Sequence, residues 1–221
     1  MAEPVKPTRR YDSPRRRQQA ADTRRDILAA AERRFEADGY AGTTMAAIAR
    51  EAGVALKTVY LAFETKSGLL RELWHLRLRG DDERTPVGER RWYLEVLDEP
   101  DPERQLRLNA RNARIVKERA GALLAVIRSA APLDPEIGGL WQRIQSDFYE
   151  NQQAIIASLQ TRDALAEGLD IVRGTDILWT LNHPDVWLLL VRERGWSPER
   201  WERWFGDTAC AQLLADPSRR P

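Results

Sequence analysis

The sequence predicts an all-α protein. Across its 221 residues, apolar side chains recur at spacings of three and four instead of alternating. Strong helix formers dominate, and runs of β-branched residues that would indicate a sheet are missing. The composition, 43% hydrophobic and 31% charged, is ordinary for a globular protein with a real core, which excludes a disordered chain or a fibre.

The formal net charge of +1 conceals an uneven distribution. Residues 1–80 hold 16 basic and 10 acidic side chains, a net charge of +6, whereas residues 81–221 hold 19 basic and 24 acidic, a net charge of −5. Such asymmetry favours a basic module joined to an acidic remainder. We therefore predict a flexible basic arm at 1–20, a basic helical domain at 21–80 and a larger helical domain at 81–221. Both a solvated tail and a DNA-contacting arm fit residues 1–20.

Cysteine use and hydropathy indicate the compartment. Cys210 is the single cysteine, so no internal disulfide can form, as expected in a reducing interior. Its helical context favours a small core residue over a redox sensor. Residues 1–25 are rich in proline and arginine, and the longest strongly apolar run, residues 186–191, is far shorter than the roughly 20 residues of a membrane helix. We expect a cytoplasmic protein without membrane contact.

The basic domain should contain three helices followed by a fourth. Thr23 can cap the first helix, and Gly39 supplies the left-handed residue that ends it. Thr43 and Thr44 offer a second capping site. The further elements that we expect are a helix at 45–52, a turn at 53–55, a helix at 56–63 and a fourth helix that opens at Thr65 or Lys66.

Residues 43–63 have the pattern of a helix-turn-helix. Two short helices that cross steeply need a small residue where they meet, here Ala49, and a glycine that can turn the chain, here Gly53. The second helix of this motif lies in the major groove of DNA, and helix N-termini and lysines bind phosphate. The DNA-binding residues that we expect are Thr43, Thr44, Ala55, Lys57, Thr58, Tyr60, Leu61 and Lys66.

A series of short motifs runs through residues 38–70. It consists of DGYAGTT at 38–44, IAREAGV at 48–54 and TVYLAF at 58–63, followed by Lys66 and a Leu-Leu pair. The series closely resembles the N-terminal domain of the TetR family of bacterial transcriptional regulators, over about residues 22–80. The resemblance implies a homodimer that binds a palindromic double-stranded operator, most often as a repressor, with a helical body that binds a small-molecule effector.

Residues 81–221 carry no motif of their own, but the helical pattern continues. Prolines and glycines divide it into segments. The helices that we expect lie at 90–97, 103–129, 137–159, 171–181, 185–194 and 198–214, with Ser197 as the cap and Pro198 at the first helical position of the last one.

Aromatic side chains dominate the candidates for an effector site. Eight tryptophans is a high count, and effector pockets are mostly apolar with a few orienting polar groups. We expect a small apolar or aromatic effector, although ordinary core packing is the alternative for each aromatic residue. The candidates are Asn109, Asn112, Trp141, Phe148, Trp179, His183 and Trp187, of which His183 could instead cap a helix end.

The last two helices have more apolar surface than one face can bury. Residues 186–191 are apolar around the whole helix, and the final helix carries a broad apolar stripe. The resemblance implies that these helices pair with their copies in a dimer. The alternative is that both helices lie at the centre of one core. The expected interface residues are Leu188, Val191, Trp201, Trp204, Phe205 and Leu213.

Two other classes of function compete with a ligand-responsive regulator. The first is an enzyme. With two histidines and one cysteine, we expect no catalytic site, no metal and no cofactor, and only residues 182–185 offer a candidate cluster. The second is a DNA-binding regulator without a small-molecule effector, which the basic module alone would allow.

Overall fold

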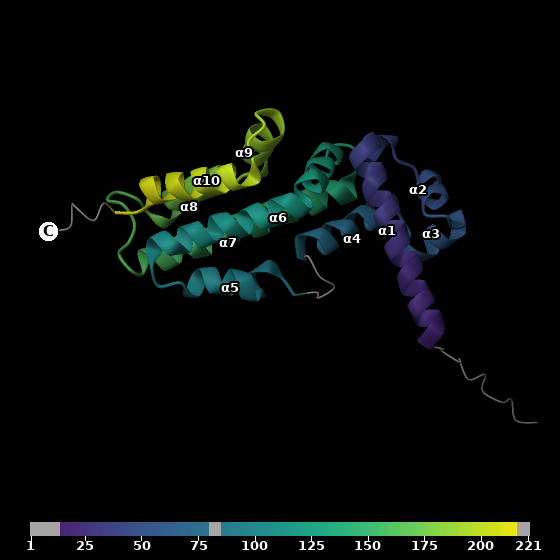
Figure 1. Cartoon of the computed structure of the whole chain (residues 1–221), viewed down its shortest axis with the longest axis horizontal. Coiled ribbons are helices and arrows are strands. Elements are labelled where there is room, and N and C mark those ends of the chain that lie inside the picture. Colours follow the sequence, from purple (N-terminus) through teal and green to yellow (C-terminus); the bar gives the residue numbers. More distant parts are fainter. Residues whose placement is uncertain (1–13, 80–84, 216–221) are drawn as a thin grey trace, which may run out of the picture. The chain divides into compact units, whose positions relative to one another are not determined.

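The computed structural model describes residues 14–79 and 85–215. Within these ranges the chain consists of helices joined by turns, and an isolated β-bridge pairs Leu165 with Leu214 (Figure 1). The all-α prediction is therefore confirmed. No helix in the described part of the chain is long and apolar enough to cross a bilayer.

The chain divides into two compact units, residues 1–69 and 70–221. The boundary falls within α4 (Lys66–Arg79), earlier than the boundary between residues 80 and 81 that the sequence suggests. The first unit also contains α1 (Pro14–Gly42), α2 (Met45–Glu51) and α3 (Leu56–Phe63).

The helix α1 begins earlier than Thr23, where the sequence predicted its start. Residues 14–20, which we expected in a flexible arm, are helical, and residues 1–13 of that arm lie outside the described residues. Pro14 is tolerated in the first turn, where its missing N–H has no helical partner to lose. The arginines, glutamines and alanines that follow are good helix formers. At the other end, Gly39 adopts a φ of +69° and interrupts the helix, as predicted.

A small apolar core holds α1, α2 and α3 together. Fully buried side chains come from each of them, and Phe35 stacks on Tyr40 with ring centroids 5.8 Å apart. The arginines of α1 add a polar connection, because Arg33 and Arg34 both donate to the carboxylate of Glu51 on α2. These hydrogen bonds, first the one from Arg33, lower the pKa of Glu51 from its ordinary value.

The second unit is built around the long helix α6 (Pro102–Ala130), which lies beside α10 (Pro198–Leu213) along much of its length (Figure 1). Its other face packs against α5 (Arg91–Asp98) and α7 (Pro135–Gln160), and α7 in turn packs against α8 (Ile171–Leu181). The remaining elements are η1 (Val87–Glu89), α9 (Pro184–Trp187) and the π-helical segment η2 (Leu188–Glu193).

Side-chain caps fix where the helices of the second unit begin. Asp101, Asp134 and Asp170 accept backbone N–H groups at the starts of α6, α7 and α8. Ser197 caps α10 through the N–H of Arg200, with Pro198 at the first helical position, as predicted. The caps satisfy backbone donors that have no partner within their helix.

The helices α7 and α8 approach closely at Gly174. A Cβ at this position would lie 2.9 Å from Cγ2 of Ile156, inside van der Waals contact. We expect Gly174→Ala to lower the free energy of unfolding by about 1–3 kcal/mol despite the better helix propensity of alanine, because the two helices must move apart. Chemical denaturation measures the change. Gly206→Ala is the matched control, since its Cβ would meet nothing nearer than 3.6 Å; equal losses in the two variants would contradict the packing argument.

Candidate nucleic-acid interface and effector site

The turn between α2 and α3 has the geometry of a helix-turn-helix. Thr44 caps α2 by accepting the N–H of Ala47 at 3.1 Å. Gly53 turns the chain with a φ of +69°, and the N–H of Val54 donates to the carbonyl of Ala49 at 3.0 Å. The small side chain of Ala49 is buried where the helices meet, as the pattern predicted.

The helix α3 buries one face and exposes the other. Val59 and Phe63 anchor it in the core of the first unit. Lys57 is exposed on the opposite side, with Tyr60 48% and Leu61 77% exposed. Ala55 is exposed at the N-cap, and Thr58 is half-buried. These five residues are the expected reading residues.

Leu56 belongs to the same exposed face and was missed from the sequence. Its side chain is 41% exposed at the first position of α3. The spacing could have revealed it, because residues four apart lie on one face of a helix and Tyr60 follows four residues later. Three large apolar side chains therefore lie exposed on a helix of eight residues, which marks a binding surface.

The sequence predicts that Thr43 contacts DNA, but the structure places its side chain in the interior of the first unit. The residue is buried, and its hydroxyl donates to the carbonyls of Gly39 at 2.8 Å and Arg34 at 3.1 Å. A side chain held in this way closes the end of α1 and is not available to a phosphate. Thr44, the neighbouring candidate, is exposed at the N-terminus of α2.

The side chain of Lys66 also contacts other residues of the first unit. Its Nζ donates to the carbonyls of Tyr40 at 2.8 Å and Thr43 at 3.0 Å, and it lies 4.1 Å from the centre of the Tyr40 ring. The amine therefore satisfies carbonyls at the end of α1. The structure thus gives Lys66 contacts within its own unit, and a contact of this lysine with phosphate stays a prediction.

We expect Lys66→Met to lower the melting temperature of the protein. The change leaves two carbonyls without their donor and removes a cation–π contact, a loss on the order of 1–3 kcal/mol. Thermal unfolding followed by circular dichroism measures it. Lys57→Met, which removes an exposed amine from α3, should leave the melting temperature almost unchanged; identical melting of both variants would remove Lys66 from its structural role.

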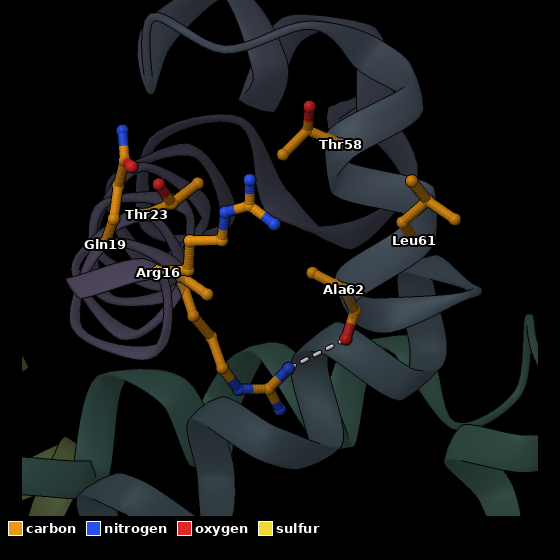
Figure 2. Close-up of a pocket in the computed structure, with 8 residues that line it drawn as sticks. Arg16, Gln19, Thr23, Thr58, Leu61 and Ala62 are labelled. Carbon is orange, nitrogen blue, oxygen red and sulfur yellow. Dashed lines mark hydrogen bonds between the residues drawn. The ribbon is translucent and has the colours of Figure 1, made fainter. Parts of the chain in front are cut away.

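An open groove of about 570 Å³ separates the start of α1 from α3. Arg16, Gln19 and Thr23 line one side, and Thr58 and Leu61 line the other. Figure 2 shows the guanidinium group of Arg16 extending into this space from α1. The groove thus brings a cation next to the exposed face of α3.

Arg24 joins the two walls of the groove. Its Nη1 donates to the carbonyl of Ala62 at 2.7 Å, the dashed line in Figure 2. Its guanidinium group also lies 4.2 Å from the centre of the Phe63 ring. The end of α3 is therefore fixed to α1 by a charged hydrogen bond and a cation–π contact.

In the second unit, three of the expected effector residues lie together. The rings of Phe148 and Trp179 have centroids 6.4 Å apart, and those of Trp179 and His183 are 4.7 Å apart. His183 also caps α9, because its Nδ1 accepts the N–H of Asp185 at 3.2 Å. Burial, followed by the charges of Arg128 and Lys117, lowers the pKa of His183.

The other expected effector residues are dispersed. Trp187 is buried edge-on against Trp201. Asn112 donates to the carbonyl of Trp92 at 2.9 Å, which gives it a structural partner. Trp141 is half-buried on α7. Asn109 is buried on α6, and its Nδ2 has no partner among the described residues.

The sequence reasoning missed Lys117, the central polar group of this region. Its side chain is buried on α6, and its Nζ donates to Oδ1 of Asn182. Asn182 in turn donates to Oε1 of Gln152 at 3.2 Å. Burial lowers the pKa of Lys117 to about 7. The sequence contains a feature that could have revealed this residue: Lys117 lies at helical spacing from Ala113 and Ala120 within the buried stripe of α6.

Three of the six expected interface residues are buried within their own chain. Trp201, Phe205 and Leu213 are fully buried, and Trp201 packs between Trp187 and Phe205 with centroid distances of 5.0 and 5.1 Å. They form part of the core of the second unit and cannot meet a partner, which corrects their assignment. Leu188, Val191 and Trp204 remain partly exposed, and Leu189 beside them is 50% exposed.

The residues weighed for chemistry have structural places as well. Asp185 pairs with Arg128, and Pro184 is buried at the start of α9. Burial raises the pKa of the Cys210 thiol, which disfavours the reactive thiolate. Among the residues that the structure describes, no cluster of histidine, cysteine, aspartate or glutamate could hold a metal ion.

Comparisons with known proteins agree with this geometry. Residues 27–73 match the family model described as bacterial regulatory proteins, tetR family. The HTH-type transcriptional regulator AcrR of Shigella flexneri is 29% identical over 114 residues, half of this chain and half of that protein. The Pseudomonas putida protein named "Probable HTH-type transcriptional regulator ArpR" is 27% identical over 214 residues, 93% of this chain and 98% of that one.

Residues 27–73 carry the N-terminal domain of the TetR family. The matched residues contain α2, α3 and most of α1, so the family model covers the helix-turn-helix and not the body. The alignment with the first of these relatives spans about half the length of that protein. Both relatives are named as transcriptional regulators and neither as an enzyme.

Several solved structures share the fold of the chain. NalD, the secondary repressor of the MexAB-OprM multidrug efflux pump in Pseudomonas aeruginosa, is 22% identical with a TM-score of 0.67, covering 89% of this chain and 98% of that one. A regulator from Saccharomonospora viridis in complex with choline is 18% identical with a TM-score of 0.69, covering 88% and 98%. The SmeT–triclosan complex is 22% identical with a TM-score of 0.64, covering 90% and 95%.

Proposed function

We propose that this protein is a ligand-responsive repressor of the TetR family that binds a palindromic operator as a homodimer. The observation that carries the proposal is the exposed face of α3, where Leu56, Lys57, Tyr60 and Leu61 project from a helix whose C-terminal end is fixed to α1. A helix held in this way can enter the major groove without rearrangement.

Each side chain on this face has a contact that suits its chemistry. Lys57 can donate to a guanine edge or to a phosphate, and the hydroxyl of Tyr60 can donate to the backbone. Leu56 and Leu61 present apolar surface, which suits the methyl groups of thymine. Arg16, in the groove beside α3, supplies a cation for a flanking phosphate.

A dimer would place two such helices on successive turns of one face of the duplex. Leu188, Leu189, Val191 and Trp204 are the partly exposed apolar residues of η2 and α10 that support a self-complementary interface. Sedimentation of the full chain at micromolar concentration tests this part of the proposal, and a well-behaved monomer would contradict it.

The body would respond to a small molecule, as the structural neighbours in complex with triclosan and choline support. An effector shifts the protein between two states only if it binds one of them better. The aromatic group of Phe148, Trp179 and His183, together with the buried Lys117, is the region where we propose that it binds.

Selection of binding sites from random double-stranded DNA tests the reading helix. The natural protein should select a palindrome, and Lys57→Ala should relax the preference at one base position in each half-site by about 1–3 kcal/mol. Arg111→Ala, which removes an exposed arginine of α6, is the control and should select the same palindrome. An unchanged preference with Lys57→Ala would overturn the role of this residue, and the absence of any selected sequence would overturn the proposed function.

A further inference from the structure

Lys117 is a buried cation whose surroundings supply no negative charge. Among the residues that the structure describes, its direct hydrogen-bond partner is the neutral amide oxygen of Asn182, which Gln152 holds in place. Among the described residues, no carboxylate pairs with Lys117; the nearby Glu118 and Glu202 both pair with Arg114 instead. A buried charge without a partner is costly, so a site of this kind favours a molecule that brings the missing charge.

The groups around Lys117 are donors and aromatic faces. Its Nζ lies 4.9 Å from the centre of the Trp201 ring and 6.0 Å from that of Phe148. The indole Nε1 of Trp201 is buried without a hydrogen-bond partner in the described part of the chain, as is Nε1 of Trp179, whose ring lies 6.4 Å from Phe148. An orphaned N–H donor requires an acceptor.

Asn109 adds another donor along the same helix. Its Nδ2 is buried without a partner among the described residues, eight positions before Lys117 and on the same face of α6. The nitrogens of Lys117 and the two tryptophans thus offer N–H groups around Phe148, and the aromatic rings offer apolar surface, whereas Asn109 lies about 12 Å further along the helix axis. Among the described residues, three of the four buried side-chain atoms without a partner are donors, and the fourth, Oε1 of Gln145, is an acceptor. Together with the charge of Lys117, the balance favours a ligand that brings acceptors and a negative charge.

We infer that Lys117 anchors the carboxylate of an organic acid with an aromatic or aliphatic body, and that such acids are the effector class of this protein. The inference rests on the proposed function, because it names the ligand of the same effector site. The carboxylate of the ligand would pair with the charged amine of Lys117 and accept a hydrogen bond from the indole N–H of Trp201. The apolar part of the ligand would pack on Phe148 and Trp179. A quaternary ammonium such as choline, which one structural neighbour binds, would be repelled.

Matched pairs of probes test the charge of the ligand. Benzoate, naphthalene-2-carboxylate and decanoate are each compared with their neutral amides by isothermal titration calorimetry on the full chain, with choline as the cationic probe. At least one acid should bind at least about tenfold more tightly than its amide. Lys117→Met should remove that preference and leave the affinity for the amide within about twofold. Arg111→Met, which removes an exposed cation from the same helix, should keep it.

The number of protons taken up on binding shows whether Lys117 holds the ligand through its charge or only through packing. His183 is the other titratable group that interacts with Lys117, and both have a lowered pKa. When an acid binds and holds Lys117 charged, the natural protein should take up close to one proton from solution at about pH 8. The Lys117→Met variant should take up close to none. The same uptake in His183→Gln as in the natural protein would assign the proton to Lys117.

The inference is overturned if no acid of the panel binds, if acid and amide bind equally, or if Lys117→Met retains the preference for the acid. Circular dichroism and the selection of DNA sites are recorded on the same preparations. A protein that still selects its palindrome but shows no preference for acids keeps the proposed DNA-binding function and loses only the effector class.

Discussion

Replacing Lys117 with methionine should stabilise the protein at about pH 6, by on the order of 1–3 kcal/mol. Methionine fills a similar volume and needs no partner, whereas the amine is buried against Trp201 and Phe148 with a single amide oxygen as its acceptor. Most substitutions of a buried residue destabilise a protein, so the direction of this change is informative.

The stabilisation should depend on pH in a defined direction. Burial lowers the pKa of Lys117 to about 7 from its ordinary value of 10.5, which the unfolded chain retains. Below pH 7 the side chain is charged in both states, and the folded protein has the full cost of the buried charge. As the pH rises from 7 toward 10.5, the folded state loses the proton first, so the natural protein becomes more stable and the advantage of methionine shrinks.

Denaturant unfolding at about pH 6, 8 and 9.5 measures this trend. Arg111→Met, the exposed control on α6, should show a small effect without the same dependence on pH. A destabilised Lys117→Met at every pH would mean that its hydrogen bond to Asn182 outweighs the cost of burial. A gain that is constant with pH would mean that the amine keeps its proton in the folded protein up to pH 9.5, so that burial does not lower its pKa.

Replacing Arg15, Arg16 and Arg17 with glutamine should lower the affinity for operator and random DNA alike, by about tenfold or more. The three arginines occupy the first turns of α1, and Arg16 lines the groove beside α3. Contacts to phosphate do not depend on the base sequence, so the selected palindrome should stay the same. The slope of the logarithm of affinity against that of salt should fall by up to about three.

The matched control replaces three exposed arginines of the body, Arg111, Arg143 and Arg203, with glutamine. This variant has the same net charge but keeps the start of α1, and its affinity for DNA should be close to that of the natural protein. If the two triple variants lose affinity equally, the effect belongs to the total charge. If only the operator is affected, the arginines read bases.

Local patterns were enough to predict the helix-turn-helix. Val59 and Phe63 are buried and Lys57, Tyr60 and Leu61 are exposed as their spacing predicted. The start of α1 could not be found in this way, because a run of arginines is equally compatible with a solvated tail and with an exposed helical turn. The residues after Pro14 are good helix formers, which explains why the structure has a helix there.

Contacts between distant residues were beyond the sequence. The position of Lys66 indicated a phosphate contact, and only the fold shows that its amine reaches the end of α1. In the body, the apolar stripe of α10 correctly predicted that Trp201 and Phe205 are buried, but a stripe does not tell whether its own chain or a second copy buries it. Lys117 was overlooked because a single charge in an apolar stripe does not disturb the period.

Three cations of the first unit hold its own helices together. Arg24 fastens the end of α3 to α1, Arg34 fastens α2 through Glu51, and Lys66 closes the end of α1. A reading helix that belongs to a unit held together in this way is ordered before it meets DNA. Association then costs little conformational entropy within this unit, and more of the contact energy remains as affinity.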